Sequence, residues 1–268
     1  MKDLMRFQFR QVLRERIFYF TFFTVTLTFF LIMLLDSGDV GEVPTTATEY
    51  LTQMLNLFSS FALMVGAVVI GIICCSDFTD KTINHELSAG RSRAAVFFSR
   101  AIPAIMATLI MVLATCILPF LAYGAINGWG DTVPVSVLVQ RFVLAAFPLL
   151  RLSCLLVLIA FVVKHIGGPL MAGFAMLFLT FGLDAGLFSL PIFDLMDDYP
   201  CLFGFSNLND LFSFDNWYVN TLVHLNIYYI YDFPLSGSYI AATVIISLVM
   251  SAVYLLLGYH FFHLDDMN

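Results

Sequence analysis

Charge is scarce in this sequence, and lysine is the scarcest of the charged residues. Only 12% of the 268 residues are charged, against about 25% in soluble globular domains. The three lysines, Lys2, Lys81 and Lys164, do not follow a glycine, so the chain contains no Walker A loop and no ATPase site of its own. The HExxH, G-x-S-x-G and C-x-x-C patterns are missing too. We therefore expect no catalytic residue, no resident metal, no cofactor and no nucleic-acid partner for this chain.

Apolar residues dominate what is present. They make up 60% of the chain, which has a mean hydropathy of +0.92. A helix needs about 20 apolar residues to cross a bilayer, and six runs reach about that length: 17–35, 55–75, 97–123, 137–163, 169–190 and 239–260. None of them alternates with the period of a barrel strand. The sequence therefore predicts an all-α membrane protein with six transmembrane helices in a single domain, 1–268.

Outside the apolar runs, lysine and arginine are confined to one side of this predicted bundle. The segments 36–54, 124–136 and 191–238 contain neither residue. The basic residues lie before the first run, in the loop 76–96 and after the fourth run, namely Lys2, Arg6, Arg10, Arg14, Arg16, Lys81, Arg91, Arg93 and Lys164. Because cytosolic segments carry the excess of such residues, we expect both termini and the 76–96 loop in the cytosol. The acidic, aromatic-rich segment 191–238 is expected outside, either as short interfacial helices or as an anchoring belt only.

The spacing within residues 1–16 predicts an amphipathic helix on the inner surface of the membrane. Lys2, Arg6, Arg10 and Arg14 recur every four residues, which places them on one face of a helix. Apolar residues lie on another side, namely Leu4, Met5, Phe9 and Val12. We expect that apolar side to enter the headgroup region while the cations pair with anionic lipid. The alternative is that residues 1–16 are a basic segment that only sets the orientation of the first span.

The segment 76–100 predicts two helices in succession. Ser76 or Asp77 can cap a first, short helix. Gly90 can end that helix because glycine accepts the left-handed conformation found after many helices. Ser92 can then cap the helix that continues as the third span. We expect a short helix across the cytosolic face, followed by a sharp turn.

Two small groups of polar residues are candidates for a metal site. Asp77 and Asp80, at i and i+3, could bind Mg²⁺ at the end of the second span, as in a membrane transferase. Such an enzyme needs a second acidic set on a facing helix, so solvated charges and a helix cap are the favoured interpretation. His260 and His263 are also only two ligands, too few for a site.

Charged residues also fall within the predicted spans. Arg141 and Arg151 lie in or beside the fourth run, and Asp184 lies in the fifth. Arg151 and Asp184 have similar predicted depths and could form an ion pair, which we favour over a substrate contact or gate. Three threonines share one face of the first run, where they could lie at a dimer seam, line a pathway or only pack: Thr21, Thr24 and Thr28.

A longer pattern, D-F-x-x-x-T-I-x-x-x-L-x-x-G-x-S-R, runs through the 76–100 segment. Together with the amphipathic N-terminus, the six spans and both ends inside, it resembles the ABC-2 family of exporter permeases. Within that family the chain is similar to the small permeases of bacitracin resistance, lantibiotic immunity and phenol-soluble-modulin export. Many members have glycine where this chain has Lys81. The pattern residues here are Asp77, Phe78, Thr82, Ile83, Leu87, Gly90, Ser92 and Arg93.

The resemblance implies a permease subunit in a bacterial plasma membrane. Two copies, as a homodimer, would form the pathway, and two ABC ATPase subunits would bind below them with ATP and Mg²⁺. The cargo would be an amphipathic peptide or antibiotic-like molecule, as in antimicrobial peptide resistance. An ATPase-independent transporter or channel is the alternative, and it predicts inverted repeats or discontinuous helices. A Mg²⁺-dependent transferase built on Asp77 and Asp80 is a third.

The resemblance also implies that the short helix after the second span is a coupling helix that docks on the ATPase. Ile83 and Leu87, at i and i+4, would form an apolar docking ridge, and Gly90 would let the chain turn tightly into the third span. Polar contacts around that ridge would come from Asp80, Lys81, Glu86 and Arg91. Asp77 and Arg93 complete the set of coupling residues.

Overall fold

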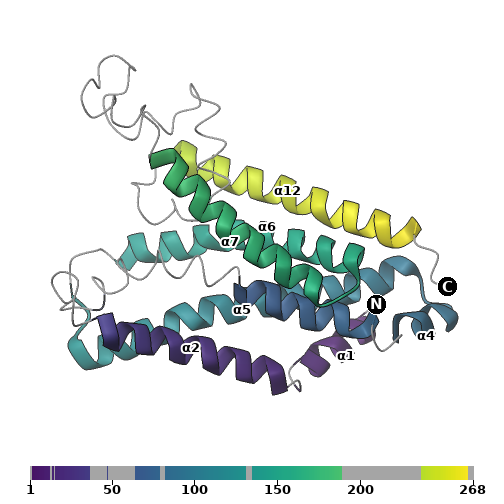
Figure 1. Cartoon of the computed structure of the whole chain (residues 1–268), viewed down its shortest axis with the longest axis horizontal. Coiled ribbons are helices and arrows are strands. Elements are labelled where there is room, and N and C mark those ends of the chain that lie inside the picture. Colours follow the sequence, from purple (N-terminus) through teal and green to yellow (C-terminus); the bar gives the residue numbers. More distant parts are fainter. Residues whose placement is uncertain are drawn as a thin grey trace, which may run out of the picture.

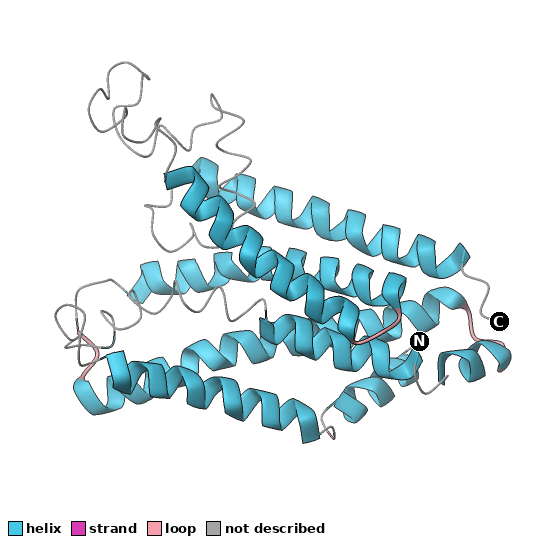
Figure 2. Ribbon diagram, in the orientation of Figure 1, coloured by secondary structure: helices cyan, strands magenta, loops and turns pink. Residues whose placement is uncertain are grey.

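Helices make up all the regular secondary structure that the computed structural model describes, which covers residues 2–12, 14, 16–36, 47, 64–78, 82–130, 135–188 and 237–264. Within these ranges no strand is present (Figure 2). The helices are α1 (Lys2–Val12), α2 (Arg16–Asp36), an unlabelled helix Met64–Phe78, α4 (Thr82–Ser88), α5 (Arg93–Asn127), α6 (Val135–Val163), α7 (Gly167–Phe188) and α12 (Gly237–Leu264). The predicted all-α class is confirmed for this part of the chain.

Three of the helical segments are long and apolar enough to cross a membrane: Arg93–Asn127, Phe142–Val163 and Ile240–Leu264. They coincide with the predicted runs 97–123, 137–163 and 239–260. Phe18–Thr28 and Met64–Phe78 are shorter apolar helices, and α7 covers most of the run 169–190. A helix satisfies its backbone polar groups internally, which apolar surroundings demand. These helices are compatible with a membrane protein. The predicted outer segment 191–238 lies outside the described residues, except for its last two.

One end of the bundle gathers the segments that carry basic residues. Figure 1 shows the N-terminus, α4 and the C-terminal end of α12 together at that end. The turn between α6 and α7 lies there too, where Lys164 has a φ of +56°. Burial lowers the pKa of the Lys164 ammonium group from its ordinary value.

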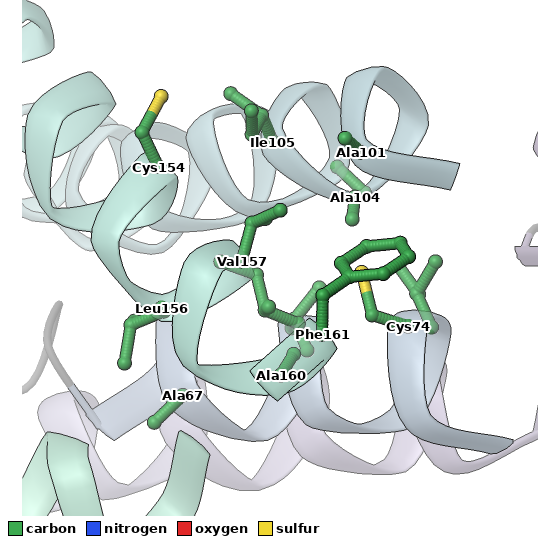
Figure 3. Close-up of a cluster of buried hydrophobic side chains, with 14 of the residues drawn as sticks. Ala67, Cys74, Ala101, Ala104, Ile105, Cys154, Leu156, Val157, Ala160 and Phe161 are labelled. Atoms are coloured by element: carbon green, nitrogen blue, oxygen red, sulfur yellow. The ribbon is translucent and has the colours of Figure 1, made fainter. Parts of the chain in front are cut away.

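α5 and α6 form the centre of the bundle. α6 packs along α12, and α5 contacts α1, α2, α4, α6 and α12. Figure 3 shows Phe161 of α6 beside Cys74 of the Met64–Phe78 helix, with Ala101 of α5 close by. On α12, a Cβ added at Gly258 would lie 3.3 Å from Cζ of Phe97, so glycine permits the close contact there. Small residues at such contacts are typical of membrane helix pairs.

α1 packs on the bundle through one face. Leu4, Gln8 and Val12 are 6%, 4% and 5% exposed, whereas Phe7 and Phe9 are 60% and 37% exposed. The prediction that Leu4 and Val12 face lipid is therefore wrong, while Phe9 does lie on the open side. The physical reason is that α5 and the Met64–Phe78 helix occupy that side of α1 and cover its apolar stripe.

Candidate functional site

The predicted break and restart of the chain between α4 and α5 are confirmed. Gly90 has a φ of +83°, and its N–H donates to the carbonyl of Leu87 at 3.0 Å. Ser92 is the N-cap of α5, and its Oγ accepts a hydrogen bond from the Ala95 N–H at 3.3 Å. Together they hold the start of α5 directly after the end of α4. The left-handed glycine and the capping serine are local features, so both can be predicted from the sequence alone.

The predicted start of the short helix is wrong. Ser76 and Asp77 lie inside the preceding helix Met64–Phe78, and α4 begins at Thr82. The Thr82 hydroxyl donates to the carbonyl oxygen of Asp77 at 3.1 Å, which ties the two helices together across the intervening residues. Asp77 does not begin α4 because its carboxylate is engaged inside the bundle.

A buried arginine holds this corner of the protein together. Arg100 of α5 is 0% exposed. Its Nε lies 2.7 Å from Oδ2 of Asp77, and its Nη1 lies 2.9 Å from Oε2 of Glu86. The same Asp77 oxygen accepts a hydrogen bond from Nε2 of Gln8 at 3.2 Å. We call Gln8, Asp77, Glu86 and Arg100 the Arg100 cluster. It joins α1, the Met64–Phe78 helix, α4 and α5.

The Arg100 cluster is a strong constraint because two of its charges are buried. The side chains of Asp77 and Glu86 are 4% and 19% exposed. A buried guanidinium is tolerated only when it is paired and hydrogen-bonded, and here two carboxylates from different helices meet it. Removal of Arg100 would leave the Asp77 carboxylate buried in an apolar setting without a cation.

A second arginine ties the start of α5 to the end of α12. Nη1 of Arg93 donates to the carbonyl oxygens of His263, at 2.5 Å, and Phe262, at 3.4 Å. Carbonyl groups at the end of a helix lack intrahelical partners and carry partial negative charge, so a cation there is favourable. Arg93 is thereby used within the chain. The expectation that it contacts a partner is not supported by this geometry.

Aromatic and aliphatic side chains cover the inner side of the loop. Phe78 packs edge-on against Phe161, with ring centroids 5.5 Å apart. Ile83 of α4 is only 1% exposed, and Leu87 is half-buried against the same core. The burial of Ile83 contradicts its place in the predicted docking ridge, whereas Leu87 is only partly covered. α4 is amphipathic, and its apolar side is already covered by its own bundle.

The outward side of the loop is polar. Its exposed residues on and just after α4 are Thr82, His85, Ser88, Ala89, Gly90, Arg91 and Ser92, which we call the outer face of α4. On the other side, Asp77 and Ile83 are buried, and Phe78 packs against Phe161.

Replacing Gly90 by valine should loosen this loop through backbone strain alone. An added Cβ would meet nothing within 4 Å, so no clash complicates the result. The left-handed conformation costs a residue with a Cβ about 1–2 kcal/mol, which corresponds to roughly ten-fold faster amide exchange over 82–92 if the loop opens locally. Asparagine, which tolerates this conformation, should change exchange less. Ala89→Val is the matched control, and equal exchange in Gly90→Val and Ala89→Val would contradict the role of Gly90.

The other predicted residues are only partly visible. Asp80 and Lys81 lie outside the described residues. Arg141 and Asp184 belong to α6 and α7, but their side chains lie outside the described residues, so the predicted pairing of Arg151 with Asp184 stays a prediction. Arg151 itself is buried on α6 at 3% exposure.

The three threonines of α2 are not equivalent. Thr24 is exposed, and its carbonyl accepts a hydrogen bond from the Thr28 hydroxyl at 2.8 Å. Thr21 is half-buried and lines a narrow apolar space with Val69 and Ile73 of the Met64–Phe78 helix. Thr21 therefore packs inside the chain, as in the simplest of the three interpretations, whereas Thr24 faces outward.

Metal-ligating residues do not gather in the described ranges. No group of three or more His, Cys, Asp or Glu residues that could hold a metal ion occurs there. Asp77 faces Arg100 and Gln8. His260 and His263 are both exposed near the end of α12, and His263 packs against the ring of Tyr259.

Two important residues escaped the sequence reasoning. Arg100 lies three residues inside the apolar run 97–123, and such a charge requires a partner. Gln8 lies midway between Leu4 and Val12 at four-residue spacing, on the stripe that the bundle covers. The place of each residue in the sequence therefore indicates a buried polar side chain.

Comparison with known proteins adds no relative. No protein-family model and no curated protein matches the sequence. The residues at this end of the bundle therefore carry the functional assignment.

Proposed function

We propose that this chain is the membrane permease subunit of an ABC-2-type exporter, driven by ATP that a separate subunit hydrolyses. The observation that supports this most is α4, a short helix fixed at one end of a bundle of apolar helices, with a polar face left open. In this proposal the end that holds α4 and both termini is cytosolic. The chain crosses a bacterial plasma membrane six times.

The attachments of α4 suit a helix that transmits force. Glu86 bonds to Arg100 of α5, and Thr82 bonds to the carbonyl of the Met64–Phe78 helix. Gly90 and Ser92 leave only a tight turn before α5. A push on α4 would therefore be passed to α5 and to the Met64–Phe78 helix through these contacts. ATP-driven closure of a docked ATPase would supply that push.

The outer face of α4 is the proposed contact with the ATPase. Arg91 and His85 are its ionisable groups within the described residues. They would suit a polar or acidic groove on the partner. This differs from the sequence-based expectation, in which an apolar ridge docks and charges surround it.

Apolar side chains remain open along the sides of the bundle. Ile102, Met106 and Ile110 of α5 are 37%, 46% and 52% exposed, and Leu256 of α12 is 65% exposed. In the proposed exporter these faces would meet lipid or the second permease copy of a homodimer. An amphipathic peptide or antibiotic-like molecule is the proposed cargo.

The alternatives find less support. A secondary transporter of the expected type has discontinuous helices, but α5 and α6 continue without a break through Pro103, Pro119 and Pro148. A Mg²⁺-dependent transferase would need the carboxylate of Asp77 for the metal. That carboxylate is paired with Arg100 at 2.7 Å.

The proposal is tested by purifying the tagged chain from its native membranes in mild detergent and identifying what accompanies it. A P-loop ATPase in stoichiometric amount is the expected partner. Combining His85→Glu with Arg91→Glu should reduce the recovered ATPase at least about ten-fold, because a reversed charge in a contact costs several kcal/mol. His260→Glu places a negative charge at the same end but away from α4, and it should leave recovery unchanged. A chain that purifies alone and still moves or modifies a substrate would overturn the proposal.

A further inference from the structure

The side of α1 that faces away from the bundle combines positive charge with exposed aromatic rings. Arg6 and Arg10 are one turn apart and exposed, and Phe7 and Phe9 flank them at 60% and 37% exposure. The exposed Arg14 lies two residues after the end of the helix. Residues 1–16 hold five basic and two acidic residues, so the segment is strongly cationic. We call Arg6, Phe7, Phe9, Arg10 and Arg14 the cationic face of α1.

This composition selects one kind of partner. Guanidinium groups pair with phosphate oxygens, and phenylalanine rings beside them enter the apolar layer just below the headgroups. α1 also lies at one end of a bundle whose helices can cross a membrane, so a bilayer surface is adjacent to it (Figure 1). Anionic phospholipid in that leaflet is therefore the occupant that the cationic face fits, by charge and by shape.

The opposite side of α1 enters the Arg100 cluster. Gln8, which is 4% exposed, donates to Oδ2 of Asp77 at 3.2 Å, and that same oxygen accepts from Nε of Arg100 at 2.7 Å. Arg100 in turn bonds Glu86 of α4 at 2.9 Å. A continuous polar path thus runs from α1 to α4, and Gln8 is the α1 side chain that enters it.

We propose that anionic phospholipid binds the cationic face of α1, and that its binding is relayed through Gln8 and the Arg100 cluster to fix the position of α4. Lipid would hold α1 against the bundle and strengthen the Gln8–Asp77 contact. Arg100 would then be oriented toward Glu86. The lipid site and the relay stand without the proposed function; only the consequence, lipid control of ATPase docking, rests on it.

The test uses the full chain in nanodiscs made of phosphatidylcholine, with and without phosphatidylglycerol, and no ATPase. Amide hydrogen exchange is followed in residues 2–12 and 82–92. Phosphatidylglycerol should slow exchange in both segments of the wild type. Combining Arg6→Gln, Arg10→Gln and Arg14→Gln should remove both responses, since each basic residue contributes about five-fold to affinity for an anionic surface. Arg91→Gln removes one positive charge just after α4 and should leave the response of 2–12 intact.

Gln8→Leu separates binding from relay. It leaves the cationic face unchanged, so exchange in 2–12 should still slow with phosphatidylglycerol, while exchange in 82–92 should no longer depend on it. Unchanged slow exchange in α5 shows that this variant is folded. The proposal is overturned if 82–92 ignores phosphatidylglycerol in the wild type, if Gln8→Leu keeps the full response of 82–92, or if free inorganic phosphate in neutral nanodiscs has the same effect. None of these outcomes depends on whether an ATPase is the partner, so the two proposals fail separately.

Discussion

Replacing Arg100 by leucine should cost more stability than any other single change at this end of the bundle. The side chain is fully buried between Asp77 and Glu86. Leucine fills part of the space but leaves the Asp77 carboxylate buried without a cation. Breaking a buried pair in this way costs about 3–5 kcal/mol, which is a large share of the roughly 5–15 kcal/mol that stabilises a typical protein. We expect thermal unfolding in mild detergent to shift down by on the order of 10 °C.

A second substitution tests the cause of that loss. If the buried carboxylate is the problem, adding Asp77→Asn to Arg100→Leu should recover much of the stability, because an amide is less costly to bury than a charge. Arg91→Leu is the matched control, because this substitution makes the same change in charge and shape at an exposed position. The assignment would be contradicted if Arg100→Leu unfolds at the same temperature as Arg91→Leu. It would also be contradicted if Asp77→Asn gives no recovery.

Length and apolarity were enough to predict where the long helices lie. The run 97–123 lies inside α5, and the runs 137–163 and 239–260 lie inside α6 and α12. Each run is long enough to form a membrane-spanning helix, and none alternates between apolar and polar residues as a β-strand does. The turn was predictable for a local reason as well: Gly90 and Ser92 act through their own backbone and the next few residues.

The side of α4 that is buried could not be predicted in the same way. Ile83 and Leu87 make an apolar stripe that suits either a partner or the chain's own bundle, and a seven-residue helix carries no further signal. The pairing of Arg100 with Asp77 and Glu86 could not be predicted for a related reason. Arg100 is 23 residues from Asp77 and 14 from Glu86, so only the way the helices pack decides that the three meet. The position of Arg100 inside an apolar run implies a counter-charge, but not which residue supplies it.

In the proposed exporter, Glu86→Arg should strongly slow ATP-driven export while the chain remains folded in the membrane. The new guanidinium would face Nη1 of Arg100, where Oε2 of Glu86 now lies at 2.9 Å. Two like charges at that distance repel, so α4 should leave its position on α5. The Asp77–Arg100 pair remains, and it holds the Met64–Phe78 helix to α5 as before. We expect export to be at least about ten-fold slower in vesicles that contain the permease and its ATPase, because movement of the ATPase would no longer pass through α4 to α5.

Glu86→Gln is the matched control because it keeps the shape of the side chain and an oxygen that can accept from Arg100. It should retain a substantial part of the export. The thermal unfolding temperature of Glu86→Arg, measured on the same preparation, should stay closer to the wild type than that of Arg100→Leu. The reason is that Glu86 is partly exposed, whereas Arg100→Leu leaves the buried Asp77 carboxylate without a cation. Export at the wild-type rate in Glu86→Arg would contradict a coupling role for α4. A variant that fails to reach the membrane would instead place Glu86 in the folding core, and its bond to Arg100 would then explain stability alone. The pair of measurements therefore separates a helix that transmits motion from one that only closes the end of the bundle.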